Sequence, residues 1–238
     1  MRVVSWNMNR RRGSWDFLKN SIEPDVALLQ EASPFDDDSI KNHSSKVTVK
    51  KNLTNVVYGK NAPPEKVKLP TDGGMGVNVS AFNFDGYGKI FFVSVYGNLG
   101  FGDNLDIHLM GVLTLYTETL RKLYGAEHIL IAGDFNMDRR MDDNPTGTKF
   151  SKVGERRQNM FFDSIKRLGF VDCLELHHPN YVQTHRHNRS DFPWQIDHMF
   201  ATETLSRSLS SLEVIETPEV ISRSDHNPII ADFDLSIA

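Results

Sequence analysis

At 238 residues, with 39% hydrophobic and 24% charged residues, the chain can bury a sizeable core, which argues against intrinsic disorder. The formal net charge of −4 excludes nucleic-acid binding through bulk positive charge, so a polyanion has to be met by local basic groups or metal ions. The single cysteine, Cys173, excludes an intrachain disulfide, and we expect it to be a buried residue near a strand end.

Short apolar runs alternate with polar loops through the first half of the chain. In chain order, the predicted elements are a strand over 2–6, a helix over 14–20, a strand over 26–29, a weak strand around Val47 and Val49 with its partner over 56–58, a glycine turn over 71–76, and a hairpin of 77–84 and 89–95. The stretch 36–69 that holds the weak pair is polar and rich in lysine.

The second half contains the two strongest helices. Residues 104–123 carry apolar side chains at helical spacing, and residues 155–168 form a second amphipathic helix. The remaining predicted strands are 128–132, 196–201, 212–215 and 228–233. Many strands with a few helices and no linker predict one α/β domain over 1–238, in which two sheets pack together and helices lie outside.

Polar side chains lie at one end of many of the predicted strands, after the earlier strands and at the start of, or just before, the last ones. They are Asn7, Gln30–Glu31, Tyr96–Asn98, Gly133–Asn136, Trp194–Asp197 and Ser224–Pro228. Each group alone is compatible with an ordinary turn or strand end. Together they would be costly to bury unless they met a metal, a substrate or one another. Carboxylate and amide oxygens without a cysteine set favour Mg²⁺ or Mn²⁺ over structural zinc.

These motifs make the sequence similar to the endonuclease/exonuclease/phosphatase family, which has the DNase I-like fold. The resemblance is carried, in the family order, by Asn7, Gln30–Glu31, Gly133-Asp134-Phe135-Asn136, Asp197 and Ser224-Asp225-His226. It implies a four-layer α/β/β/α sandwich of two packed mixed sheets flanked by helices. It also implies a phosphoric ester hydrolase that uses Mg²⁺, with Mn²⁺ as the alternative, to cleave with an activated water.

The resemblance also assigns roles to matched residues. Glu31 resembles the main metal ligand of the family, with Asn7 and Asp225 as helpers. Asp134 resembles the group that orients or deprotonates the attacking water, and Asn136 its partner in positioning water and phosphate.

Three further catalytic residues, His226, Asp197 and Tyr96, and the substrate-binding residue Asn98 complete the implied set. His226 would donate a hydrogen bond to a phosphate oxygen, while Asp197 holds its imidazole. Tyr96 and Asn98 fall where exonuclease III-like members have Tyr-x-x-Asn, although the spacing here is shorter by one residue.

The substrate is predicted less directly. Arg10, Arg139, Arg186 and Trp194 lie within a few residues of the proposed cleft groups, and a basic rim on an acidic protein favours nucleic acid, DNA or RNA. The alternative is that these arginines are solvated loop charges. A phosphatase of inositol phosphates or another small phosphoester, and a non-catalytic nucleic-acid-binding module, stay open as alternatives.

Location and partners are also predicted from what the sequence lacks. It shows no signal-peptide pattern and no run of roughly 20 apolar residues, so we expect a cytoplasmic protein without membrane insertion. No feature indicates an obligate protein partner. Lipid hydrolysis is disfavoured because it would call for a secretion signal or an apolar membrane-facing loop. The Phe101 region is only a weak candidate for such a loop.

Overall fold

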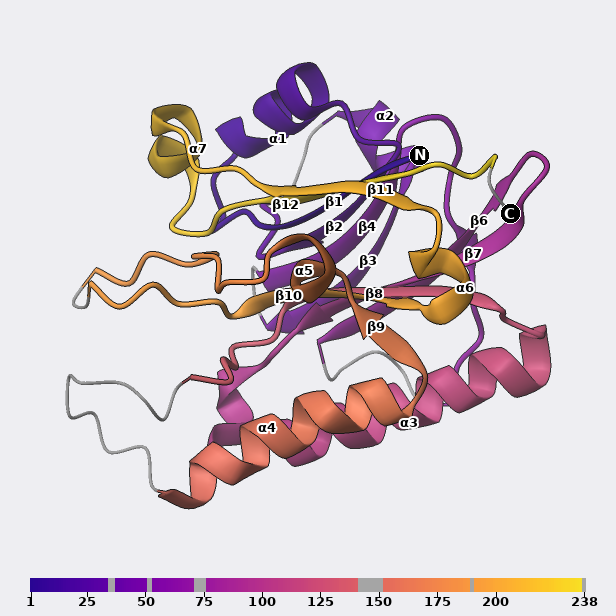
Figure 1. The fold of residues 1–238 in the computed structure, drawn as a ribbon. Helices are drawn as coiled ribbons and strands as arrows, with labels where there is room; N and C mark the ends of the chain where they lie inside the picture. Colours follow the sequence, from indigo (N-terminus) through magenta and orange to yellow (C-terminus); the bar gives the residue numbers. More distant parts are fainter. Residues whose placement is uncertain (34–36, 51–52, 71–75, 141–151, 189–190, 237–238) are drawn as a thin grey trace.

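The described part of the chain builds two six-stranded β-sheets that pack face to face, with helices on both outer surfaces (Figure 1). This computed structural model describes all residues except 34–36, 51–52, 71–75, 141–151, 189–190 and 237–238. The architecture confirms the predicted four-layer α/β/β/α sandwich. Among the described residues, no helix is both long enough and apolar enough to cross a membrane.

The first sheet combines both ends of the chain. Its strands, in spatial order, are β11 (Leu209–Val214), β12 (Ile229–Phe233), β1 (Arg2–Asn7), β2 (Val26–Gln30), β4 (Leu53–Gly59) and β3 (Ser44–Lys50). β1 and β2 run parallel, and the other neighbours are antiparallel, so the sheet is mixed.

The second sheet is formed by the middle of the chain. Its strands, in spatial order, are β5 (Glu65–Lys66), β6 (Val77–Phe84), β7 (Gly88–Tyr96), β8 (His128–Asp134), β10 (Asp197–Thr202) and β9 (Phe170–Asp172). Here β7 and β8 are the parallel pair. Their carboxyl ends therefore lie at one edge, beside the start of the antiparallel β10.

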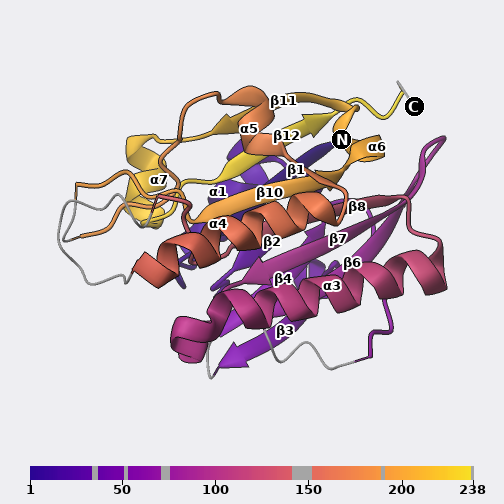
Figure 2. The same cartoon turned by 60° about the horizontal axis from the view of Figure 1, so that its bottom comes forward.

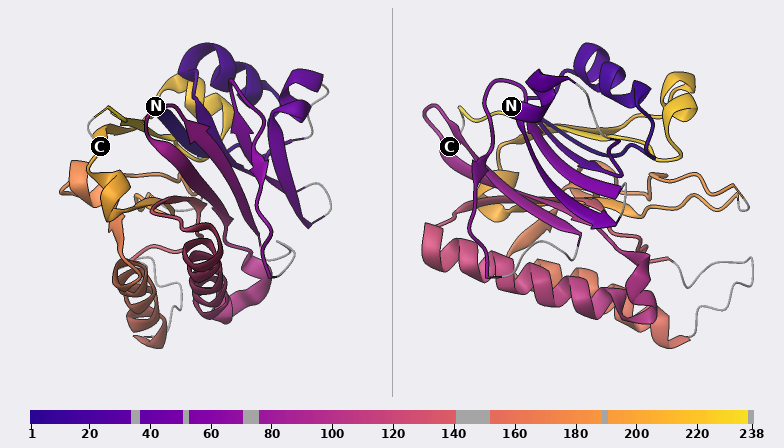
Figure 3. Two further views of the ribbon diagram at one scale, coloured as in Figure 1. Left: turned by 90° about the vertical axis from the view of Figure 1, so that its right-hand side faces the viewer. Right: turned by 180° about the vertical axis from the view of Figure 1, so that it is seen from behind.

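The helices cover the two outer faces. α1 (Gly13–Phe17), the π-helix η1 (Leu18–Ile22), α2 (Asp38–Asn42) and α7 (Pro218–Arg223) lie over the first sheet. α3 (Leu105–Tyr124) and α4 (Lys152–Arg167) run side by side over the second, as Figures 2 and 3 show. The short elements η2 (Leu99–Asn104), α5 (Cys173–His177) and α6 (Glu203–Ser206) complete the chain.

Three hydrophobic clusters fill the three gaps between the four layers. Strand alternation sends Val3 into the cluster between the sheets and Val4 into the cluster under the first-sheet helices. On the second sheet, Ile90 points into the cluster between the sheets and Ile129 into the cluster under the long helices α3 and α4. Both sheets are thus buried on both faces, which explains why their strands are almost continuously apolar in sequence.

Most predicted elements are present, with differences at their ends. All ten predicted strands and the β3–β4 pairing are found, and both long helices are confirmed. The helix predicted over 14–20 is instead α1 continued by η1, whose extra residue per turn brings the Glu23 N–H to the Leu18 carbonyl. The short elements α2, β5, β9, α5, α6 and α7 were not predicted. Residues 71–75 of the predicted glycine turn lie outside the described residues.

Candidate active site

Polar side chains from both sheets meet at one edge of the sandwich. In the first sheet, Asn7 at the end of β1 pairs with Gln30 at the end of β2. In the second, Asp134 at the end of β8 lies between Tyr96 of β7 and Asp197 of β10. Register therefore fixes which polar residues are neighbours within each sheet.

Asp134 is the buried centre of this group. Its Oδ2 accepts a hydrogen bond of 2.9 Å from the amide of Asn7 across the two sheets, and its Oδ1 accepts one of 2.9 Å from the Asn136 backbone N–H. Asn136 adopts a left-handed backbone (φ 53°), and its own amide donates to the Gly97 carbonyl. A strained turn held in this way is common at functional sites.

Asp197 and His226 form a buried pair beside Asp134. The Asp197 Oδ2 lies 2.8 Å from His226 Nδ1, and His226 Nε2 lies 4.0 Å from the Asp134 Oδ2. The other Asp197 oxygen finds no hydrogen-bond partner among the described residues. The loop before β12 is fixed by Ser224, whose hydroxyl donates to the Asn7 carbonyl and accepts from the His226 N–H.

Burial and neighbouring charges shift the pKa values of His226 and Asp134. Burial lowers the pKa of His226, but the carboxylates of Asp197, Asp134 and Asp225 outweigh it and raise the pKa to about 9. Burial raises the pKa of Asp134 to about 7, and Asp197 adds to this rise while His226 and Asn7 oppose it. Burial and neighbouring charges thus favour a cationic His226 imidazole beside an Asp134 carboxyl group whose pKa is raised.

Glu31 lies next to this group and is linked to the second sheet by Tyr96. The Tyr96 hydroxyl donates to one Glu31 oxygen at 2.9 Å, and the exposed Arg10 guanidinium lies 3.1 Å from the other. Burial and Glu31 raise the pKa of Tyr96 above its ordinary range, so the phenol remains a donor. Glu31 and Arg10 both have left-handed backbones, with φ of 46° and 58°.

Asn9, a residue that the sequence analysis did not single out, connects two of the predicted metal ligands, Asn7 and Asp225. Its backbone N–H donates to the Asn7 side-chain oxygen, and its amide donates to the Asp225 Oδ1 at 3.0 Å. Its position two residues after Asn7 is a signal that could have found it. By contrast, Gln30 is fully buried and donates to Ser94 and to the Leu28 carbonyl, which makes it a structural residue.

A second missed residue, His185, lies against His226 in an otherwise irregular segment. The two imidazole rings are 4.5 Å apart between centroids, and burial together with His226 lowers the pKa of His185 to about 4. Thr184, the preceding residue, accepts hydrogen bonds from the backbone N–H groups of Ile196 and Asp197. No strand or helix pattern marks this segment in the sequence.

Two glycines let the strand ends approach. A Cβ on Gly133 (φ 151°) would overlap the Val95 carbonyl of the neighbouring strand, and one on Gly97 would overlap the backbone of Phe135. Any side chain at these two positions would separate Tyr96 from Asp134. The Gly in the Gly-Asp-x-Asn motif therefore has a packing cause.

The donor chemistry of the site fits a hard divalent cation. Carboxylate oxygens of Glu31, Asp134 and Asp225 are gathered with amide groups, and the chain's one cysteine is buried elsewhere, at the start of α5. Asp134, Asp197 and His226 also place ligand atoms within 4.8 Å of one another. Such oxygen-rich sets suit Mg²⁺ or Mn²⁺.

The predicted substrate-binding residues differ from one another in exposure and in their contacts. Arg10 is exposed beside Glu31, and the Asn98 side chain caps η2 by accepting from Gly100. Arg186 donates to the Ser224 carbonyl and to Asn227, behind the His226 loop. Trp194 is buried against Phe192.

Arg139 packs against α4. Its guanidinium lies 3.1 Å from Asp163 and stacks over Phe162, both on α4. These contacts are those of a structural arginine, because they neutralise the charge and cover one face of the guanidinium.

Comparisons with known proteins agree with this fold. The sequence pattern of the endonuclease/exonuclease/phosphatase family matches residues 4–226. Among curated protein sequences, none matches at a significant level. Three solved structures have the same fold: a 3'-5' exonuclease (NExo) from Neisseria meningitidis (TM-score 0.71, 21% identity, 98% of this chain and 100% of that one), an AP endonuclease from Archaeoglobus fulgidus (0.71, 21%, 98% and 99%), and the endonuclease domain of the telomere-specific retrotransposon TRAS1 (0.68, 17%, 98% and 97%).

Proposed function

Because this chain belongs to the endonuclease/exonuclease/phosphatase family, we propose that it is a Mg²⁺-dependent phosphodiesterase that cleaves DNA or RNA with an activated water. The observation that carries the proposal is the buried cluster of Asp134, Asp197 and His226, joined to the first sheet by Asn7. Phosphate ester hydrolysis needs a positive group that binds the phosphate oxygens and a group that positions the attacking water. The His226–Asp197 pair can serve as the first, and Asp134 as the second.

The metal would be held by Glu31, with Asn7 and Asp225 beside it. When bound, Mg²⁺ or Mn²⁺ supplies positive charge to the phosphate oxygens and to the leaving group. Tyr96 orients Glu31 from the second sheet. Arg10, which lies beside Glu31 in the metal-free protein, is exposed and free to turn outward toward a substrate strand.

Asp134 is proposed to take a proton from the attacking water. A base works best when its pKa is near the working pH, and the pKa of about 7 meets this condition in the metal-free protein. Asn136 is anchored to the Gly97 carbonyl and to Asp134, so it can position water and phosphate with little loss of side-chain entropy.

His226 is proposed to donate a hydrogen bond to a phosphate oxygen from Nε2. Asp197 binds the opposite nitrogen, which fixes the ring and stabilises its charged form. A preformed cation in a water-poor site stabilises the extra charge of the transition state more than it would in bulk water.

Nucleic acid is the favoured substrate for two reasons. The similar structures are described as an exonuclease, an AP endonuclease and a retrotransposon endonuclease, and one was solved with a product DNA hairpin. Arg10, Arg11 and Arg12 also follow the site directly, and their side chains are exposed.

The test is a gel assay of single- and double-stranded DNA and RNA with Mg²⁺ or Mn²⁺. We expect cleavage of at least one substrate, loss of cleavage with EDTA, and loss in Glu31→Ala and His226→Ala. Glu118→Ala, on the outer helix α3, is the matched control and should cleave like the wild type. Undiminished cleavage in both site variants would overturn the proposal.

A phosphatase is the second candidate, because one similar structure is described as the 3' phosphatase NExo. Hydrolysis of bis-p-nitrophenyl phosphate without hydrolysis of the monoester supports the phosphodiesterase. Hydrolysis of the monoester alone supports the phosphatase. Nucleic-acid binding without hydrolysis of either ester would instead identify a non-catalytic binding module.

A further inference from the structure

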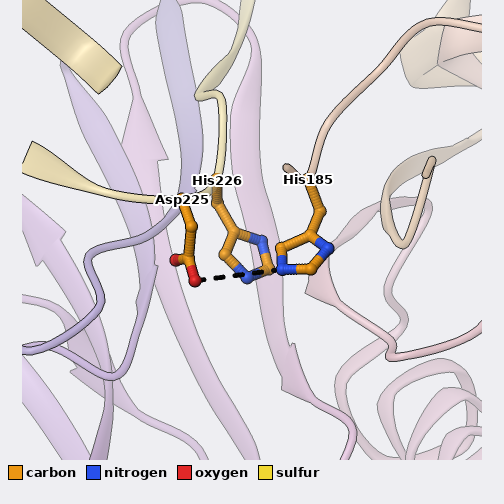
Figure 4. Close-up of side chains that lie close together, drawn as sticks. All are labelled: His185, Asp225 and His226. Atoms are coloured by element: carbon orange, nitrogen blue, oxygen red, sulfur yellow. Dashed lines mark ion pairs between the residues drawn. The ribbon is translucent and has the colours of Figure 1, made fainter. Parts of the chain in front are cut away.

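Three side chains that could ligate a metal converge at His226. They are His185, Asp225 and His226, shown in Figure 4. Each offers one ligand atom, and these atoms lie within 4.8 Å of one another. His185 Nε2 is 3.9 Å from the Asp225 Oδ2.

The backbone fixes this arrangement. His185 forms β-bridges with both Trp194 and His226, and its N–H donates to the Trp194 carbonyl at 3.0 Å. Asn9 occupies the Asp225 Oδ1, which leaves Oδ2 facing His185. The His185 side chain is only 15% exposed, so little side-chain freedom remains to be lost when a ligand binds.

We propose that His185, Asp225 and His226 form a binding site for a transition-metal dication of the zinc class, which shares Asp225 with the proposed magnesium site but does not use Glu31. Two imidazoles and one carboxylate make a ligand set that Zn²⁺, Co²⁺ and Ni²⁺ favour, whereas Mg²⁺ favours all-oxygen sets. Three protein ligands leave the fourth position to water or to a substrate oxygen.

Asp197 makes His226 a suitable ligand for this ion. Its carboxylate accepts from His226 Nδ1, so a neutral imidazole there has its free lone pair on Nε2, the atom that faces His185 and Asp225. A carboxylate behind a ligating histidine is the usual outer-shell arrangement of zinc sites.

The spacing between His185 and Asp225 needs only a small adjustment. Zinc bonds of about 2.0–2.1 Å place tetrahedral ligand atoms roughly 3.3–3.4 Å apart. The observed 3.9 Å between His185 and Asp225 has to shorten by roughly half an ångström. Asp225 is about half exposed, so rotation of its side chain can supply this movement.

Occupation of this site has a consequence for catalysis, and this step rests on the proposed function. The metal and the substrate phosphate would compete for the same atom, His226 Nε2. Zn²⁺ should therefore inhibit Mg²⁺-supported cleavage, and the inhibition should require His185.

Metal binding is tested by titrating Co²⁺ into the full chain in excess Mg²⁺ and following its visible absorption, since tetrahedral cobalt absorbs far more strongly than octahedral cobalt. We expect one strongly absorbing Co²⁺ per chain, displaced by Zn²⁺. His185→Ala should weaken binding on the order of tenfold or more. Glu31→Gln and the surface control His177→Ala should bind as the wild type does.

Absence of strong absorption in the wild type would overturn the proposal, as would equal Co²⁺ affinity in wild type and His185→Ala. His185→Gln, which keeps most of the side-chain volume, and the melting temperature of each variant separate lost binding from misfolding. The cobalt readout needs no catalysis, so failure of the proposed nuclease activity would leave this result intact. Zinc inhibition that persists unchanged in His185→Ala would contradict the competition for His226.

Discussion

The side-chain amide of Asn7 in one sheet donates a hydrogen bond of 2.9 Å to the carboxylate of Asp134 in the other. Both residues are buried, and each ends the strand that carries it. This bond joins the two halves of the sandwich at the point where the proposed metal ligands and proposed catalytic groups meet. It also stabilises the ionised form of Asp134, whose pKa burial would otherwise raise further.

Asn7→Ala should therefore slow turnover by about 10- to 100-fold, because a hydrogen bond to a charged group contributes about 1.5–3 kcal/mol. The rate of nucleic-acid or diester cleavage at several pH values measures this effect. The rising limb of the pH–rate profile should also move to higher pH. The reason is that the Asp134 carboxylate loses the hydrogen bond from Asn7, which lowers the pKa of Asp134. Asn83→Ala, on the exposed end of β6, is the control and should leave rate and profile unchanged. An unchanged rate in Asn7→Ala would exclude the bond from catalysis.

Asp197→Asn should lower the pKa of His226 and slow turnover on the order of a hundredfold. The reason is that the pair loses the carboxylate that lies 2.8 Å from His226 Nδ1 and contributes most to raising that pKa. NMR titration of the His226 ring protons, assigned with His226→Gln, measures the shift, and the cleavage assay measures the rate. Turnover within about threefold of the wild type would show that the pair is no phosphate clamp.

The stability of the metal-free protein should depend on His226 between pH 6.5 and 9. The folded pKa of about 9 exceeds the ordinary value of 6.5, so the stabilisation is complete below pH 6.5 and is lost as the pH rises to 9. The loss should be on the order of 1–3 kcal/mol. Urea unfolding across this range measures it. His226→Gln should flatten the curve, and equal slopes in the two proteins would contradict the assignment.

Glu31→Gln should abolish the stabilisation that Mg²⁺ gives to the fold. Ligands that bind only the folded state raise its melting temperature, and loss of one carboxylate weakens a magnesium site strongly. Thermal unfolding with and without Mg²⁺ checks this without any substrate. Glu118→Gln, which removes an exposed acid paired with Lys122 on α3, should keep the full Mg²⁺ shift. A full shift in Glu31→Gln would place the metal elsewhere.

Gly133→Ala should destabilise the fold by about 3 kcal/mol or more, because the new Cβ overlaps the Val95 backbone of the adjacent strand. Gly111→Ala is the matched control. Its Cβ meets no atom within 4 Å on the exposed side of α3, so it should raise stability by about 0.5–1 kcal/mol. Urea unfolding of both variants gives the comparison, and a well-tolerated Gly133→Ala would mean that the strands can separate.

The sequence predicted the strand ends well because the relevant signal is local. An apolar run followed by Asn7, Glu31 or Asp134 marks both the strand and the polar residue that leaves it. The two-sheet packing was also accessible, since strands buried on both faces read as continuous apolar runs.

The pairings across the sheets could not be predicted in this way. Asn7 and Asp134 are 127 positions apart, and nothing in either segment specifies the other. His185 lies in a segment without periodicity, and only the β-bridge to His226 makes it part of the site. Arg139 resembled a cleft arginine in sequence because it follows Asn136 closely, but the fold turns it toward Asp163.

The central claim is that Asp134 and His226, from different segments, act on one phosphate as a single unit. The most direct measurement is the single-turnover cleavage rate of Asp134→Asn, His226→Gln and the double variant in saturating Mg²⁺. Residues of one catalytic unit are strongly non-additive, so we expect the double variant to be about as slow as the slower single variant. If the rate of the double variant instead fell by the product of the two single-variant factors, the residues would act independently, which would contradict the account.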